Sequence, residues 1–182
     1  LTKAVNVIHG LAEKVEDVYI EKDTLSASKT ESRDEEFITI ENEDLRLKVS
    51  TKGGWMYSAE LKDFKRYDKD TLFLFKGDEA RFNLELFNKR SVRLNTETEY
   101  FTPIVSNGGK TLTMRLGYSS DQFIDFVYTL PQTGYLINFD ILVNGMASEL
   151  HPESLRNFII TWNQKLRQQE KGKNFENRYA TI

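Results

Sequence analysis

The sequence predicts an all-β protein, an antiparallel twisted β-sandwich. From residue 37 onward, apolar and polar residues alternate with a period of two, as in strands with one buried face. Turn signals rich in Gly, Asn and Pro separate these stretches at short intervals. The chain has 182 residues, 39% of them hydrophobic and 12% aromatic, which is enough for one sizeable core. The sequence contains no internal repeat of fixed period, which argues against a propeller or a solenoid.

Residues 1–36 differ from the rest of the chain. Residues 21–36 are rich in Ser, Thr, Lys, Asp and Glu, a composition typical of a solvated linker. We therefore predict an N-terminal helix or linker over residues 1–36 and a β-sandwich domain over residues 37–182. The short amphipathic helix is predicted from apolar residues at helical spacing, namely Leu1, Val5, Ile8, Leu11, Val15 and Val18.

About nine strands are predicted in the second part. Gly53 and Gly54 separate two of them and are interpreted as a structural turn that needs positive φ. They do not resemble a phosphate-binding loop, because they open no helix. The strands are expected at residues 37–41, 45–50, 55–61, 72–75, 82–86, 112–116, 124–130, 135–143 and 158–162.

Charge and composition restrict the function. A net charge of -3 supplies no broad cationic field for nucleic acid. The chain has no cysteine, and its two histidines, His9 and His151, lie outside the predicted strands. No serine-hydrolase, zinc or phosphate-loop motif occurs. The sequence therefore predicts no catalytic residue, no cofactor and no metal site. It also contains no run of about 18 apolar residues, the length needed to span a membrane.

Aromatic residues crowd the stretch from residue 55 to residue 82. We interpret them mainly as core residues, while an apolar groove at the sandwich edge is the best candidate for a peptide or a lipid-like ligand. The residues concerned are Trp55, Tyr57, Phe64, Tyr67, Phe73, Phe75 and Phe82.

A long polar segment, residues 163–179, follows the last predicted strand. Its charges roughly compensate one another, so a solvated surface segment is one interpretation. Its many amides can also pair with exposed backbone, which suits covering a sheet edge or receiving a partner strand. Trp162 is expected to be a core aromatic residue at the strand end. Partner contact is predicted for Trp162, Gln164, Lys165, Arg167, Gln169, Glu170 and Lys171.

Several motifs together resemble one known family. The segment from Trp162 reads W-x-Q-K-x-R-x-Q-E-K-G, and E-N-R follows it at residues 176–178. With these motifs, the chain over residues 37–182 resembles the periplasmic domain of the YidC-type bacterial membrane protein insertase. The other matching motifs are Lys52-Gly53-Gly54, Leu74-Phe75-Lys76-Gly77-Asp78, Phe87-Asn88-Lys89 and Tyr100-Phe101-Thr102-Pro103.

The resemblance implies a sandwich of the supersandwich type, similar to galactose mutarotase. It implies a location at the periplasmic face of the bacterial inner membrane, in a multi-pass protein whose membrane anchor precedes residues 1–36. The implied role is accessory and not enzymatic: the domain assists the insertion and folding of inner-membrane proteins. The implied partners are Sec translocon components, nascent membrane proteins and the remainder of the insertase.

Two expectations remain open at this point. The family domain continues for further strands, so the sandwich is expected to be incomplete at its C-terminal end. The alternative function is a carbohydrate-binding or carbohydrate-active protein of mutarotase-like fold, which would need polar and aromatic residues on one concave face.

Overall fold

The computed structural model describes residues 34–154, 156–172, 174 and 178. The predicted N-terminal helix, most of the predicted linker and His9 lie outside these residues. In the described part, antiparallel strands account for most of the regular structure, so the predicted all-β class is confirmed. No helix in this part is long and apolar enough to cross a membrane. The domain boundary near residue 36 stays a prediction, although the first strand begins at Phe37.

The described residues form eleven strands in three antiparallel sheets, with the strand orders β1-β2-β3-β4, β10-β9-β8-β7 and β11-β5-β6. The 3-10 helices η2 (Gly77–Glu79), η3 (Thr96–Thr98), η4 (Asn107–Gly109) and η5 (Met146–Ser148) lie in connections between strands. The strands are β1 (Phe37–Glu41), β2 (Leu45–Ser50), β3 (Met56–Lys65), β4 (Thr71–Lys76), β5 (Ala80–Phe87), β6 (Arg93–Asn95), β7 (Thr102–Ser106), β8 (Thr111–Gly117), β9 (Phe123–Thr129), β10 (Asn138–Asn144) and β11 (Ile159–Gln164).

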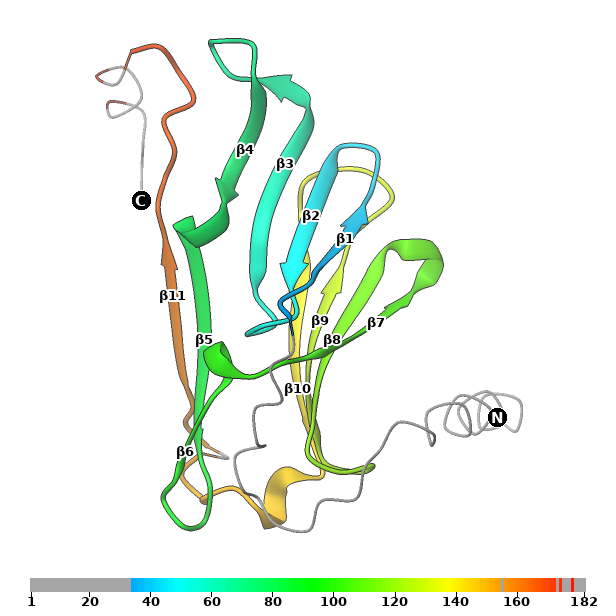
Figure 1. Ribbon diagram of the computed structural model, residues 1–182, viewed down its shortest axis with the longest axis vertical. Helices are drawn as coiled ribbons and strands as arrows, with labels where there is room; N and C mark the ends of the chain where they lie inside the picture. Colours follow the sequence, from blue (N-terminus) through cyan, green and yellow to red (C-terminus); the bar gives the residue numbers. More distant parts are fainter. Residues whose placement is uncertain (1–33, 155, 173, 175–177, 179–182) are drawn as a thin grey trace.

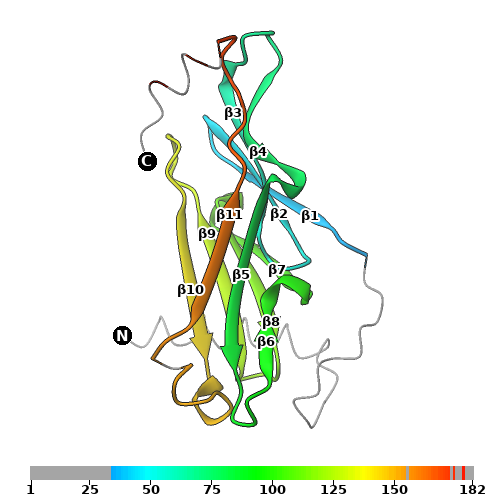
Figure 2. The ribbon, with the colours of Figure 1, turned by 90° about the vertical axis from the view of Figure 1, so that its left-hand side faces the viewer.

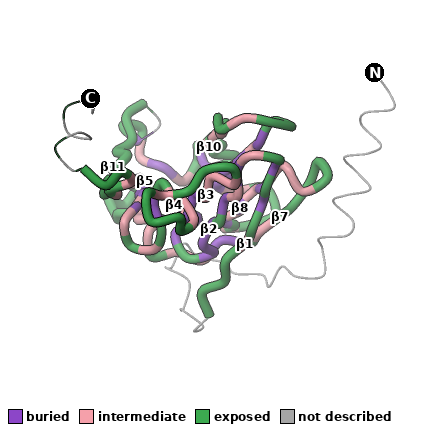
Figure 3. Tube along the Cα trace, turned by 90° about the horizontal axis from the view of Figure 1, so that it is seen from above, coloured by how far each residue is buried: buried purple, intermediate pink, exposed green. Residues whose placement is uncertain are grey.

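The strands build two layers (Figure 1). One layer is the sheet β10-β9-β8-β7. The other layer holds the remaining two sheets, which are connected because β4 runs through η2 directly into β5. Figure 2 shows the second layer from the side of β5 and β11, and Figure 3 shows the buried residues lying between the layers.

Aromatic side chains fill the space between the layers. Phe126 of β9 lies 5.5 Å from Phe82 of β5 and 4.9 Å from Phe101, measured between ring centroids. Tyr128, also on β9, donates a hydrogen bond of 2.7 Å to the carbonyl of Gly54 in the other layer. Because Ile124, Phe126 and Tyr128 alternate with outward-facing residues, the period of two in the sequence produces this inner face directly.

All nine predicted strands are present, but two strands were not predicted. β6 has only three residues, and β7 contains Pro103 and has exposed or half-exposed residues throughout, so neither shows alternation. β10 begins at Asn138 rather than at residue 135. The reason is that residues 131–134 form a loop held by the β1–β2 turn, where the Asn42 amide donates to the carbonyls of Pro131 and Gly134.

The predicted aromatic core is only partly correct. Trp55, Phe75 and Phe82 are buried. Phe64 and Tyr67 are exposed, which corrects their assignment to the core. They lie where β3 ends and its hairpin with β4 begins, beyond the part of β3 that pairs with β2.

The predicted turn at Gly53 and Gly54 is confirmed, because their φ angles are +77° and +64°. A methyl group at Gly54 would lie 3.0 Å from the Phe126 ring and 3.1 Å from the Phe101 ring. Gly54 therefore allows the turn to approach the aromatic core closely. Gly108 has a similar φ of +60°, but a methyl group added at Gly108 would have no other atom within 4 Å.

Replacing Gly54 with Ala is expected to lower the free energy of unfolding by roughly 2–3 kcal/mol, since backbone strain and overpacking add. Gly108→Ala carries the strain alone and is expected to cost only about 1 kcal/mol. Urea unfolding followed by circular dichroism measures both changes. Equal losses in the two variants would show that the contact with Phe101 and Phe126 does not matter.

Candidate functional site

In the described part of the chain, two edge strands from opposite layers lie on the same side of the sandwich. Among the described strands, β11 is the outermost strand of its sheet and pairs only with β5, and β10 is the outermost strand of the opposite layer. The Phe82 ring contacts Trp162 of β11 and Phe139 of β10, at centroid distances of 6.4 and 5.3 Å. The inner faces of both edge strands therefore line the same opening, which we call the open side.

Apolar side chains at the open side belong to the inner faces of the sheets. On β11, Ile160 and Trp162 stand opposite the buried residues Leu84 and Phe82. On β10, Val143 stands opposite the buried Ile124. These three inner-face residues are nevertheless exposed, by 45%, 54% and 43% respectively. Large apolar groups on a core-facing strand surface favour contact with another polypeptide.

Trp162 was expected to be a core aromatic residue, but the structure shows that it is exposed. It points to the core side of its sheet, as its pairing with Phe82 shows, but it is 54% exposed. The cause is its position on an edge strand, where no residue of the opposite layer in the described chain covers it. The amide-rich sequence after Trp162 gives no warning of this exposure.

The polar segment after β11 runs along the edge of β4. The Lys165 amide donates to the Glu79 carbonyl at 2.6 Å, and the Arg167 guanidinium forms an ion pair of 2.8 Å with the Glu79 carboxylate. The Gln169 side-chain amide donates to the Phe73 carbonyl of β4 at 2.7 Å. The segment thus covers a sheet edge, one of the two roles that its amides suggested.

The residues predicted for partner contact divide into two groups in the structure. Arg167 and Gln169 are half-buried and hold the segment against η2 and β4. Trp162 belongs to the open side. Partner contact stays a prediction for the whole set, whose exposed members are Trp162, Gln164, Lys165, Glu170 and Lys171.

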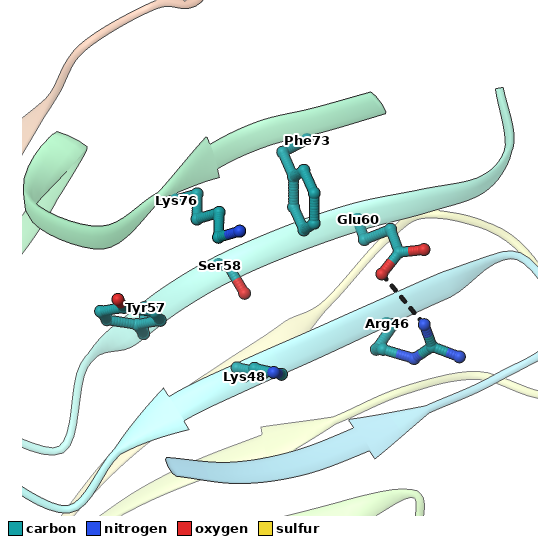
Figure 4. A pocket seen from close by; sticks show the side chains of 7 residues that line it. All are labelled: Arg46, Lys48, Tyr57, Ser58, Glu60, Phe73 and Lys76. Atoms are coloured by element: carbon teal, nitrogen blue, oxygen red, sulfur yellow. Dashed lines mark hydrogen bonds and ion pairs between the residues drawn. The ribbon is translucent and has the colours of Figure 1, made fainter. Parts of the chain in front are cut away.

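A small pocket lies on the outer face of the sheet β1-β2-β3-β4 (Figure 4). Its volume is about 110 Å³. Among the described residues that line it, the only carboxylate is Glu60, which pairs with Arg46 at 3.0 Å. The pocket is formed by Arg46 and Lys48 of β2, Tyr57, Ser58 and Glu60 of β3, and Phe73 and Lys76 of β4.

Two tyrosines with raised pKa values, Tyr118 and Tyr128, lie outside this pocket. Burial raises the pKa of Tyr128, whose hydroxyl has the structural role of binding the Gly54 carbonyl. Burial also raises the pKa of Tyr118, with a contribution from the charge of Glu99. In the described part of the chain, no three carboxylate or histidine groups are arranged to hold a metal ion. His151 lies in a loop, where its Nδ1 accepts a hydrogen bond of 3.3 Å from the Glu153 amide.

The fold and the open side together define a class of protein: an antiparallel β-sandwich domain whose described part has an edge strand with exposed apolar side chains. Residues 37–180 match the family described as the YidC periplasmic domain. The chain belongs to this family, and it is a domain on the periplasmic side of the bacterial inner membrane.

Curated relatives support the assignment. The chain is 41% identical over 148 residues to the membrane protein insertase YidC of Azobacteroides pseudotrichonymphae, covering 81% of the chain and 24% of the relative. It is 37% identical over 173 residues to the protein of that name from Bacteroides fragilis strain ATCC 25285, covering 94% of the chain and 27% of the relative. The chain thus spans about a quarter of these relatives. No solved structure gives a significant match, and the comparisons do not support the carbohydrate alternative.

Proposed function

We propose that this chain is an accessory domain of a membrane protein insertase. In this proposal, it assists the insertion and folding of inner-membrane proteins by contacting other polypeptides and catalyses no reaction itself. The family assignment and the printed names of the relatives support the insertase context. The open side supports the mode of action, since it offers apolar side chains next to a strand edge with which no other described strand pairs.

The occupant of the open side in this proposal is an extended segment of a nascent membrane protein. Such a segment would pair with the free edge of β11 and lay apolar side chains over Ile160 and Trp162. Strand addition satisfies the backbone groups of an edge strand, while alternate side chains of the added strand enter the apolar space. The remainder of the insertase and a component of the Sec translocon are the other polypeptides that could supply the segment.

Photocrosslinking in the intact insertase tests this proposal. A photoreactive residue at position 160 is expected to crosslink to a nascent membrane protein, and the identity of the crosslinked chain distinguishes this from a translocon component. The same residue at Ile104, which is 40% exposed on β7 at the far edge of the opposite layer, serves as the control. Equal yields at the two positions, or a crosslink to the translocon only, would contradict the proposed occupant.

A charge on the inner face of β11 is expected to reduce this crosslinking. Ile160→Lys places an ammonium group where the added strand would cover it, and we expect about a tenfold loss of crosslinking to a probe at position 162, because burying an unpaired charge is costly. Ile159→Lys is the matched control, since Ile159 lies on the same strand with 53% exposure but stands opposite Glu85 on the outer face. An equal loss in both variants would show that the inner face has no special role.

A further inference from the structure

The pocket on the outer face of the sheet β1-β2-β3-β4 arises from two irregularities in strand pairing. The register between β2 and β3 shifts after Lys48, so that Tyr57 and Ser58, although adjacent in sequence, both line the pocket. The register between β3 and β4 shifts between Ala59 and Glu60, which leaves Leu74 as an extra residue between the paired positions 73 and 75. β-bulges re-aim side chains in this way and are frequent next to binding sites.

Ser58 forms the floor of this pocket between two lysines. Its direct neighbours across the strands are Lys48 on β2 and Lys76 on β4. Ser58 as a whole is only 3% exposed, but its hydroxyl oxygen is not among the fully buried polar atoms that lack a partner in the described part of the chain, so this atom opens into the pocket. Figure 4 shows the Ser58 hydroxyl and the Lys76 ammonium group pointing into the pocket. A hydroxyl that opens into a pocket between two ammonium groups can donate a hydrogen bond to an anion bound there.

The charges of the pocket are unbalanced toward the positive sign. The Glu60 carboxylate is engaged by Arg46, whose guanidinium also binds Glu41 at 2.7 Å. Neither Lys48 nor Lys76 forms an ion pair with a described carboxylate. The Lys76 ammonium instead lies 4.9 Å from the centre of the Phe73 ring, which orients it over the pocket. Two ammonium groups with no carboxylate partner thus stand on either side of one hydroxyl donor.

We infer that this pocket binds a phosphate-type oxyanion, either free phosphate or the phosphate of a lipid headgroup. The planar guanidinium of Arg46, which would match a carboxylate, is occupied by Glu60 and Glu41. The donors that remain are two ammonium groups and the Ser58 hydroxyl, which approach from separate strands. A tetrahedral phosphate presents several oxygens in different directions and fits such donors, since lysine binds phosphate as a point charge.

Titration of the 182-residue chain with inorganic phosphate, followed by amide NMR, tests the site. We expect saturable shifts centred on Ser58 and its strand neighbours. In the variant Lys48→Gln/Lys76→Gln the affinity is expected to fall about tenfold or more, and in Ser58→Ala about threefold, as charge-assisted hydrogen bonds are lost. The matched control is Lys65→Gln/Lys89→Gln, which changes the net charge equally at two exposed lysines outside the pocket.

Vesicles distinguish the two sources of phosphate. Binding to phosphatidylglycerol vesicles that is absent with phosphatidylcholine, competes with phosphate and is lost in Lys48→Gln/Lys76→Gln would assign a lipid headgroup. Binding of dissolved phosphate alone would assign a soluble phosphate compound. The inference is overturned if the pocket variant and its control lose equal affinity, if phosphate causes no saturable shifts, or if only an acidic peptide binds.

Discussion

Replacing Phe126 with Ala is expected to lower the free energy of unfolding by about 3–5 kcal/mol, the range for a fully buried aromatic residue. Phe126 is 0% exposed, and its ring contacts those of Phe82, Phe101 and Phe139 at centroid distances of 5.5, 4.9 and 5.7 Å. These partners come from both layers, so the cavity would open in the centre of the sandwich. Urea unfolding, monitored by tryptophan fluorescence, measures the change.

The size of this loss is expected to depend on the burial of the phenylalanine. The same substitution at an exposed phenylalanine tests this. Phe158 lies just before β11 and is 55% exposed, so Phe158→Ala is expected to change the free energy of unfolding by less than about 1 kcal/mol. Phe126→Leu keeps most of the apolar volume and is expected to fall between these two variants. If Phe126→Ala were as mild as Phe158→Ala, the two layers would not be held together through this ring cluster.

The strands of the sandwich could be predicted because their alternation reports burial directly. In β9, Ile124, Phe126 and Tyr128 are buried because every second residue of a strand faces the same side. The same rule fails where a strand has no buried face. The residues of β6 are exposed or half-exposed, and Pro103 lies within β7, so neither strand carries the pattern.

The candidate sites were harder to predict because they depend on how strands are placed, not on local pattern. The apolar run that ends at Trp162 suggested a core position, but only the sheet order shows that β11 is an edge strand, where Trp162 stays exposed. The outer-face pocket needs register shifts after Lys48 and beside Leu74, and the alternation of a single strand does not show where a bulge interrupts its pairing. The amide-rich composition of residues 163–179, by contrast, suggested either edge covering or pairing with a partner strand. The hydrogen bond from Gln169 to β4 agrees with edge covering.

The contacts of Asn42, a residue in the β1–β2 turn, could also be predicted only in part from the sequence. Its side-chain oxygen accepts hydrogen bonds from the amides of Asp44 and Leu45, at 3.0 and 2.7 Å. Such local bonds are typical of Asn in a turn. Its side-chain amide also donates to the carbonyls of Pro131 and Gly134, about 90 residues away in sequence. Nothing in the local sequence predicts this second pair, which connects the β1–β2 turn to the loop before β10.

Asn42→Ala is expected to lower the free energy of unfolding by about 4 kcal/mol, because four hydrogen bonds of about 1 kcal/mol each are lost. Asn42 is only 5% exposed, so water cannot readily replace the missing side chain. Asn42→Asp keeps the acceptor for the turn but places a second oxygen against the carbonyls of Pro131 and Gly134. It separates the contribution of the turn from that of the connection between layers.

Asn138 provides the matched control, since it is exposed and its side chain makes no hydrogen bond among the described residues. Asn138→Ala is expected to stay within about 0.5 kcal/mol of the unmodified chain. An Asn42→Asp variant clearly more stable than Asn42→Ala would place most of the stabilisation in the turn bonds to Asp44 and Leu45, because Asp keeps their acceptor. An Asn42→Ala variant that loses less than about 1 kcal/mol would contradict the role of Asn42 as the connection between the two layers.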